Sequence, residues 1–190
     1  MLYALSTKIL TVVEVAKLDE GFETFSRKHR ESLISGVSAG FFFIVAGALF
    51  VITPNLFDKI VALFRDFGLE QIPHVGILWP APAYPMSHSV VYLAVERFCF
   101  IWGIFEIVLL VLRLVLRSPV DKTTETLSNI VYWFGSGFLV RTFLLETLRL
   151  PTILGLTRWF VFWAALIMLL GATLVIRAIV RAAIPLRYTT

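Results

Sequence analysis

The stretch Val95–Pro119, VERFCFIWGIFEIVLLVLRLVLRSP, decides the fold class because it is long and apolar enough to cross a bilayer. It nevertheless carries three ionisable residues, Glu96, Arg97 and Glu106. The whole chain has the same character, since 58% of its 190 residues are hydrophobic and 16% are charged. Soluble domains are about one-quarter charged. We therefore expect an all-α integral membrane protein.

Four apolar segments predict four transmembrane helices, at residues 33–53, 89–116, 126–148 and 158–183. Between the second and third spans, Ser118 is predicted to cap a helix whose first turn contains Pro119. The spans and their loops form one predicted domain, residues 31–185, which is followed by a short tail at 186–190.

The distribution of basic residues predicts the orientation. Lys and Arg are more frequent beside the spans on the side that holds both termini than on the opposite side. Because cytoplasmic flanks carry the excess of these residues, both termini are predicted to be cytoplasmic. Trp159 and Trp163 then fall near the outer interface, where amphipathic rings prefer to lie.

Two segments outside the spans are predicted to form amphipathic helices. In residues 1–30, apolar side chains recur at helical spacing, which predicts a helix on the cytoplasmic surface or against a partner. The outer loop, residues 54–87, begins with NLFDKIVALFRDFGLEQI (55–72), which predicts a helix on the outer surface. The rest of this loop is expected to be an ordered cover with Trp79 and Tyr84 at the interface.

The outer loop also contains five candidate metal ligands, His74, His88, Asp58, Asp66 and Glu70. Their spacing is not tight, so an ordinary polar loop is the favoured interpretation over a metal site. No histidine lies in a predicted span, which excludes a bis-histidine haem inside the bilayer. The only cysteine, Cys99, excludes a disulfide or iron–sulfur centre made by this chain alone. No cofactor is expected.

Depth along the spans predicts partners for the charged positions. Glu96 and Arg141 each lie about seven residues below the outer end of antiparallel spans, so a contact between them is predicted. Glu106 lies deeper, level with Arg177, its best interhelical partner; Arg113 is its nearest basic neighbour on the same helix. Such pairs would fix helix register. The alternative is that Glu96 or Glu106 lines a path for ions or protons.

Arginines form two i, i+4 pairs at the cytoplasmic ends of the second and fourth spans, Arg113 with Arg117 and Arg177 with Arg181. Contact with anionic lipid headgroups is their expected role. The alternative is a vestibule that draws in anions.

The two pairs also raise the question of a duplication. LVLRLVLRSP (110–119) resembles LVIRAIVRAAIP (174–185), and ESLISG (31–36) resembles ETLSNI (125–130). One interpretation is two parallel helical-hairpin repeats related by an axis along the membrane normal. The other is that any apolar helix with a cytoplasmic end carries arginines there.

Gly36, Gly40 and Gly47 share one face of the first span, and Gly36 and Gly40 have the small-residue spacing that lets helices approach closely. This face is the predicted helix contact, within the bundle or between subunits. It leaves Phe41–Phe43 largely for lipid or a partner.

The sequence contains no HExxH, GxSxG or glycine-rich phosphate loop, so enzymatic activity is not expected. The net charge of +4 arises beside the spans and does not indicate nucleic-acid binding. The expected function is a non-catalytic structural or accessory subunit of a membrane assembly, whose partners are membrane lipids and itself or other membrane subunits. The alternatives are a homo-oligomeric channel or carrier for ions or small solutes that uses Glu96 and Glu106, and a lipid-binding or lipid-modifying protein.

Overall fold

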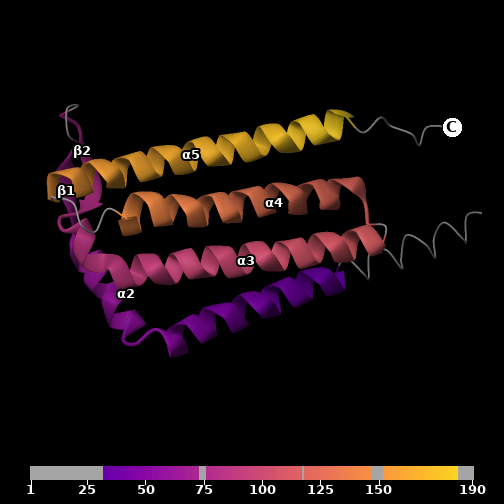
Figure 1. The fold of residues 1–190 in the computed structure, drawn as a ribbon, viewed down its shortest axis with the longest axis horizontal. Coiled ribbons are helices and arrows are strands. Elements are labelled where there is room, and N and C mark those ends of the chain that lie inside the picture. The colour runs from indigo at the N-terminus through magenta and orange to yellow at the C-terminus, as the bar shows by residue number, and fades with distance from the viewer. Residues whose placement is uncertain (1–31, 73–75, 117, 147–151, 184–190) are drawn as a thin grey trace, which may run out of the picture. The chain divides into compact units, whose positions relative to one another are not determined.

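The computed structural model describes residues 32–72, 76–116, 118–146 and 152–183 (Figure 1). It divides into two compact units, Met1–Phe41 and Phe42–Thr190. The predicted amphipathic helix at 1–30, the tail at 186–190, His74 and Arg117 lie outside the described residues.

Three helices are long and apolar enough to cross a membrane: Ser32–Ile52, Pro85–Val115 and Gly155–Ala182. They match the predicted spans at 33–53, 89–116 and 158–183. The helical membrane class is therefore supported, and three of the four predicted spans are helices that could cross a bilayer.

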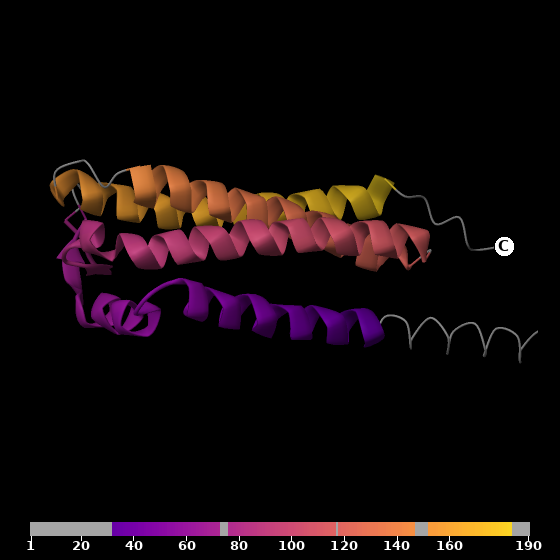
Figure 2. The same cartoon turned by 60° about the horizontal axis from the view of Figure 1, so that its bottom comes forward.

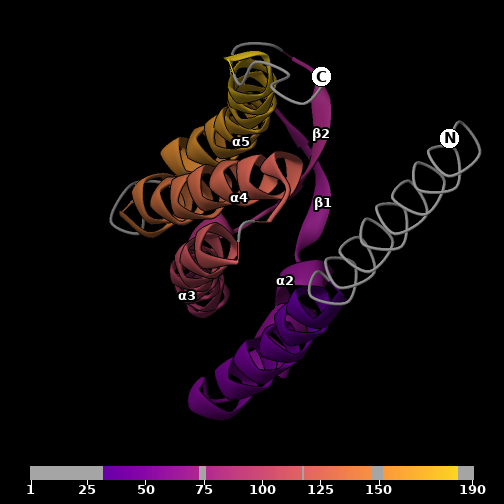
Figure 3. The ribbon, with the colours of Figure 1, turned by 90° about the vertical axis from the view of Figure 1, so that its right-hand side faces the viewer.

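The second unit is built around three long helices, α3 (Ser89–Val115), α4 (Val120–Leu139) and α5 (Thr152–Ala183). The helix α4 continues into a π-helical turn, η2 (Val140–Leu145). Figure 2 shows the three long helices running alongside one another, and Figure 3 shows α4 between α3 and α5. The two long helices that α4 contacts, α3 and α5, are therefore both candidate membrane spans.

The start of α4 differs from the prediction. Pro119 itself is the N-cap residue, α4 begins at Val120, and no side chain caps it, so the predicted Ser118 cap is wrong. The carbonyl of Pro119 accepts hydrogen bonds from the amides of Lys122 and Thr123. The Ser118 amide instead donates to the carbonyl of Arg113 at 2.9 Å, which closes the end of α3.

The outer loop folds into a helix and a hairpin. The helix α2 (Leu56–Arg65) is followed by antiparallel strands β1 (Phe67–Gln71) and β2 (Leu78–Pro82), and a 3-10 turn, η1 (Pro85–His88), leads into α3. The prediction that the helix continues to Ile72 is wrong. The helix α2 ends at Arg65, shortly before Gly68. FGLEQ (67–71) then pairs with LWPAP (78–82), with Phe67 opposite Pro82.

A buried core lies where the hairpin meets the bundle. Its members are fully or nearly fully buried: Ala81, Tyr92, Val140, Leu144, Trp159 and Phe162. Trp159 is 5% exposed and contacts the rings of Phe67 and Tyr92, so its side chain belongs to this core. Trp163, one turn later, is 40% exposed.

Close helix packing uses other glycines than those predicted. A Cβ added to Gly103 of α3 would lie 2.8 Å from the ring of Phe134 on α4, which lets these helices approach closely. By contrast, a Cβ added to Gly47 would have nothing within 4 Å. The predicted contact of the face of Gly36, Gly40 and Gly47 stays a prediction.

The phenylalanine run of the first predicted span is divided between contact and exposure. The ring of Phe42 lies 5.6 Å from that of Phe98 and 5.7 Å from that of Trp102, both on α3. Phe43 is 72% exposed. Phe42 thus contacts α3 while 43% of its surface stays exposed, and the prediction that the run is left largely for lipid or a partner stays a prediction.

Candidate functional site

The predicted contact between Glu96 and Arg141 is present. Arg141 Nη1, on the π-helical turn η2, lies 3.5 Å from Glu96 Oε1 on α3. Glu96 is buried, whereas the Arg141 side chain is 62% exposed and reaches the carboxylate from the surface. The pair therefore ties η2 to α3 without burying both charges.

Glu106 has a different partner from the one predicted. Its carboxylate is buried and accepts a hydrogen bond from Asn129 Nδ2 of α4 at 3.3 Å. The side chain of Trp102, one turn earlier on α3, also hydrogen-bonds to it. Arg177 instead lies 3.8 Å from Glu125, so the predicted pair of Glu106 with Arg177 is wrong. The reason is that α4 lies between α3 and α5 and presents its own polar side chains to each of them.

The predicted arginine site is gathered on the first turns of α4. We call this group the α4-start cluster; its members are Arg113, Asp121, Glu125, Arg177 and Arg181. Arg181 Nε lies 2.9 Å from Asp121 Oδ1, and Arg113 Nη1 donates to the Lys122 carbonyl at 2.8 Å and to Thr126 Oγ1. These arginines therefore bond to α4 from both sides.

Glu125 is the electrostatic centre of the α4-start cluster. Partial burial on its own would raise the pKa of Glu125, but the hydrogen bond from Lys122 and the positive charges of Lys122, Arg177 and Arg113 lower it below its ordinary value. Lys122 Nζ lies 3.1 Å from Glu125 Oε2. Glu125 therefore stays charged at neutral pH and links α4 to α5.

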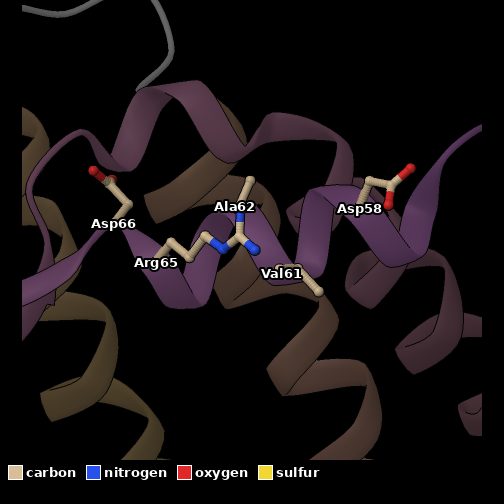
Figure 4. A pocket seen from close by; sticks show the side chains of 5 residues that line it. All are labelled: Asp58, Val61, Ala62, Arg65 and Asp66. Carbon is tan, nitrogen blue, oxygen red and sulfur yellow. The ribbon is translucent and has the colours of Figure 1, made fainter.

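Of the candidate metal ligands that the structure describes, Asp66 and His88 contact each other. Asp66 Oδ2 bonds to His88 Nε2 at 2.8 Å and accepts the Tyr84 amide at 2.9 Å. Figure 4 shows the cavity of about 440 Å³ along α2, with Asp58 and Asp66 toward its two ends and Arg65 between them. No group of three His, Cys, Asp or Glu side chains that could hold a metal occurs among the residues described. Asp66 instead joins the end of α2 to the start of α3.

A cavity that sequence reasoning missed lies inside the second unit. We call it the aromatic cavity; it has a volume of about 300 Å³, and its walls come from α2, α3, α4, η2 and α5. Tyr92, Ser136 and Trp159 line it, together with Cys99, Tyr132, Trp133 and apolar side chains.

A second cavity of about 200 Å³ is lined only by apolar side chains, which come from the helix Ser32–Ile52, α2 and α3. Neither Glu96 nor Glu106 lines this cavity or the aromatic cavity. The charged positions and the open spaces of the bundle are thus separate features.

No protein-family model matches the chain. No curated protein and no solved structure matches it either.

Proposed function

We propose that the chain is a non-catalytic, multi-pass membrane protein that acts as a structural or accessory subunit of a membrane assembly. The observation that carries this proposal is that the charged side chains of the bundle bond to other side chains of the same bundle. Glu96 pairs with Arg141, Glu106 bonds to Asn129, and Arg177 pairs with Glu125. Charges engaged in this way hold helices in register.

The proposed topology has four crossings. Three are the helices named above, and the additional crossing, third along the chain, is formed by residues 126–145 of α4 and η2. At about 1.5 Å per residue these residues span about 30 Å, the thickness of the hydrocarbon core. Polar side chains in this segment are compatible with a crossing because they bond back to the helix. Thr126 Oγ1 donates to the Lys122 carbonyl at 2.9 Å, and Ser128 Oγ donates to the Thr124 carbonyl at 3.0 Å. With four crossings and basic flanks on one side, both termini are proposed to be cytoplasmic.

The proposed duplication would make the helix Ser32–Ile52 with α3 equivalent to α4 with α5. In the alignment of 110–119 with 174–185, Arg113 matches Arg177. Both arginines act electrostatically on Glu125, one from α3 and one from α5, which supports equivalent positions for them.

The proposed docking surface is the face of Gly36, Gly40 and Gly47. Gly47 has nothing within 4 Å of an added Cβ in the part of the chain that the structure describes, and small residues let a second helix approach closely. The proposed partner is a membrane helix of another subunit or of a second copy. Anionic headgroups are proposed partners of the partly exposed Arg177 and Arg181.

The test is the composition of the protein purified from its native membranes in mild detergent. Gly40→Leu should remove subunits that co-purify at a fixed ratio with the wild type. The matched control is Gly171→Leu, because Gly171 of α5 also has nothing within 4 Å but lies outside the proposed face. Equal recovery of the partner with both variants would contradict the proposal.

A second candidate function is a homo-oligomeric channel or carrier for ions or small solutes. It is favoured by Glu106, a buried carboxylate whose hydrogen bond comes from the neutral amide of Asn129. Such a group could bind a cation or take up a proton. Cation and proton flux into vesicles containing the protein should then fall in Glu106→Gln, whereas a structural subunit should give no flux above empty vesicles.

A further inference from the structure

Three of the residues that line the aromatic cavity each carry a buried polar side-chain atom that lacks a bonding partner. Tyr92 of α3, Ser136 of α4 and Trp159 of α5 are each more than nine-tenths buried. Their Oη, Oγ and Nε1 atoms have no hydrogen-bond partner among the residues that the structure describes. Buried polar groups in proteins are nearly always hydrogen-bonded, because leaving one without a partner costs free energy. Three such groups around one cavity indicate that something in the cavity bonds to them.

The chemistry of the walls restricts what this occupant can be. The indole N–H of Trp159 can only donate a hydrogen bond, and the hydroxyls of Tyr92 and Ser136 can donate or accept. The cavity is not lined by Lys, Arg, His, Asp or Glu among the described side chains. An ionised ligand would therefore be buried without an opposite charge, which is unfavourable. The occupant that fits is uncharged, mostly apolar, and carries a hydrogen-bond acceptor.

The edges of the aromatic cavity indicate where this ligand comes from. Val95 of α3 and Trp163 of α5 line the cavity and are 44% and 40% exposed. Both side chains lie on candidate membrane spans. The accessible edge of the cavity is thus apolar and belongs to helices that would contact lipid. A volume of about 300 Å³ is at the lower end of the range for small-molecule sites.

We propose that the aromatic cavity binds an uncharged, lipid-like molecule from the membrane and holds it by hydrogen bonds from the polar side chains of Trp159, Tyr92 and Ser136 to its oxygen atoms, a carbonyl oxygen among them. The carbonyl belongs to an ester of an acyl lipid or to a lipid-soluble quinone. This site is independent of the glycine face, so it does not rest on the accessory function proposed above.

The experiment uses the full chain in phosphatidylcholine vesicles and a monoacylglycerol that carries a photoreactive diazirine on its acyl chain. Labelled peptides are mapped by mass spectrometry, and we expect label on α3 and α5. Excess unlabelled monoacylglycerol should displace the probe if the site takes acyl esters. Excess decyl-ubiquinone should displace it if the site takes quinones. Displacement by neither compound would overturn the proposal.

A cavity-filling pair of variants locates the site. Ser136→Leu fills the aromatic cavity and removes its hydroxyl, and labelling should fall at least tenfold. The matched control is Ala94→Leu, which fills the neighbouring apolar cavity, of which Ala94 is a lining residue. It should leave labelling unchanged. Equal labelling of the wild type and a folded Ser136→Leu variant would overturn the proposal.

Two conservative variants test the hydrogen bonds and do not depend on Ser136→Leu being folded. Tyr92→Phe and Trp159→Phe keep an aromatic ring but remove a polar atom. Labelling by the ester probe should fall several-fold, while labelling by a diazirine-bearing alkane should not change. Unchanged labelling by the ester probe in both variants would indicate that the polar atoms bond only to water and would overturn the proposal.

Discussion

The two ends of the bundle of α3, α4 and α5 are held together by different forces (Figure 1). At the start of α4, Arg113, Arg177 and Arg181 bond to polar groups of α4. At the end beside the β-hairpin, aromatic rings such as those of Tyr92 and Trp159 pack around a cavity. The charged end uses directional contacts that fix helix register, whereas the aromatic end depends on the volume of its side chains. Substitutions should therefore have different sizes and different pH dependence at the two ends.

The largest effect is expected from removing a ring at the aromatic end. Trp159→Ala should lower the free energy of unfolding in detergent by about 3–5 kcal/mol, because a buried large side chain is lost and the cavity grows. The measurement is a denaturant titration followed by circular dichroism. Trp163→Ala is the control, since Trp163 is 40% exposed. An equal loss in the two variants would mean that burial does not distinguish these rings.

A somewhat smaller effect is expected where α3 and α4 approach each other closely. Gly103→Ala places a Cβ 2.8 Å from the ring of Phe134, and such overpacking should cost about 1–3 kcal/mol. Gly171→Ala, where nothing lies within 4 Å, should stabilise α5 by about 0.5–1 kcal/mol because alanine favours helices. Thermal unfolding of both variants shows whether each substitution lowers or raises the stability of the protein. A stabilised Gly103→Ala would show that α3 and α4 are not in close contact.

The pair of Glu96 and Arg141 should show a modest coupling. A double-mutant cycle with Glu96→Gln and Arg141→Gln should give a coupling free energy of about 0.5–1 kcal/mol, because the arginine is mostly exposed. The single variants and the double variant are compared by chemical unfolding. Additive losses would show that the two side chains do not interact.

The smallest effect is expected from pH at the charged end. The pKa of Glu125 is lowered in the folded protein, so its stabilising contribution is present above the unfolded pKa of about 4.3. That contribution is lost as the pH falls through the still lower folded value. Between pH 6 and pH 3 the melting temperature of the wild type should therefore fall further than that of Glu125→Gln. Parallel curves would contradict the assigned role of Glu125.

The sequence predicts the features of this fold that depend on local composition or on position along a helix. Apolar length predicted the helices at 33–53, 89–116 and 158–183, because a span needs a certain number of apolar residues whatever surrounds it. Depth counting predicted the contact between Glu96 and Arg141, because antiparallel helices place equal depths side by side.

The features that the sequence did not predict depend on how the helices are ordered in space and on which segments pair. Glu106 bonds to Asn129 because α4 is the middle helix, and no property of the α3 sequence indicates that order. The same order buries Trp159 and brings Ser136 to the aromatic cavity. FGLEQ forms a strand because it pairs with LWPAP, and an amphipathic pattern alone does not reveal this pairing.

The most direct test of the proposed function is the mass of the assembly released from native membranes in mild detergent, measured by native mass spectrometry for the wild type, Gly40→Leu and Gly171→Leu. A structural subunit should appear in a complex with other membrane subunits at a fixed ratio, and this complex should be lost in Gly40→Leu and kept in Gly171→Leu. A homogeneous homo-oligomer without companions, unchanged by either substitution, would contradict the proposal and favour the channel or carrier.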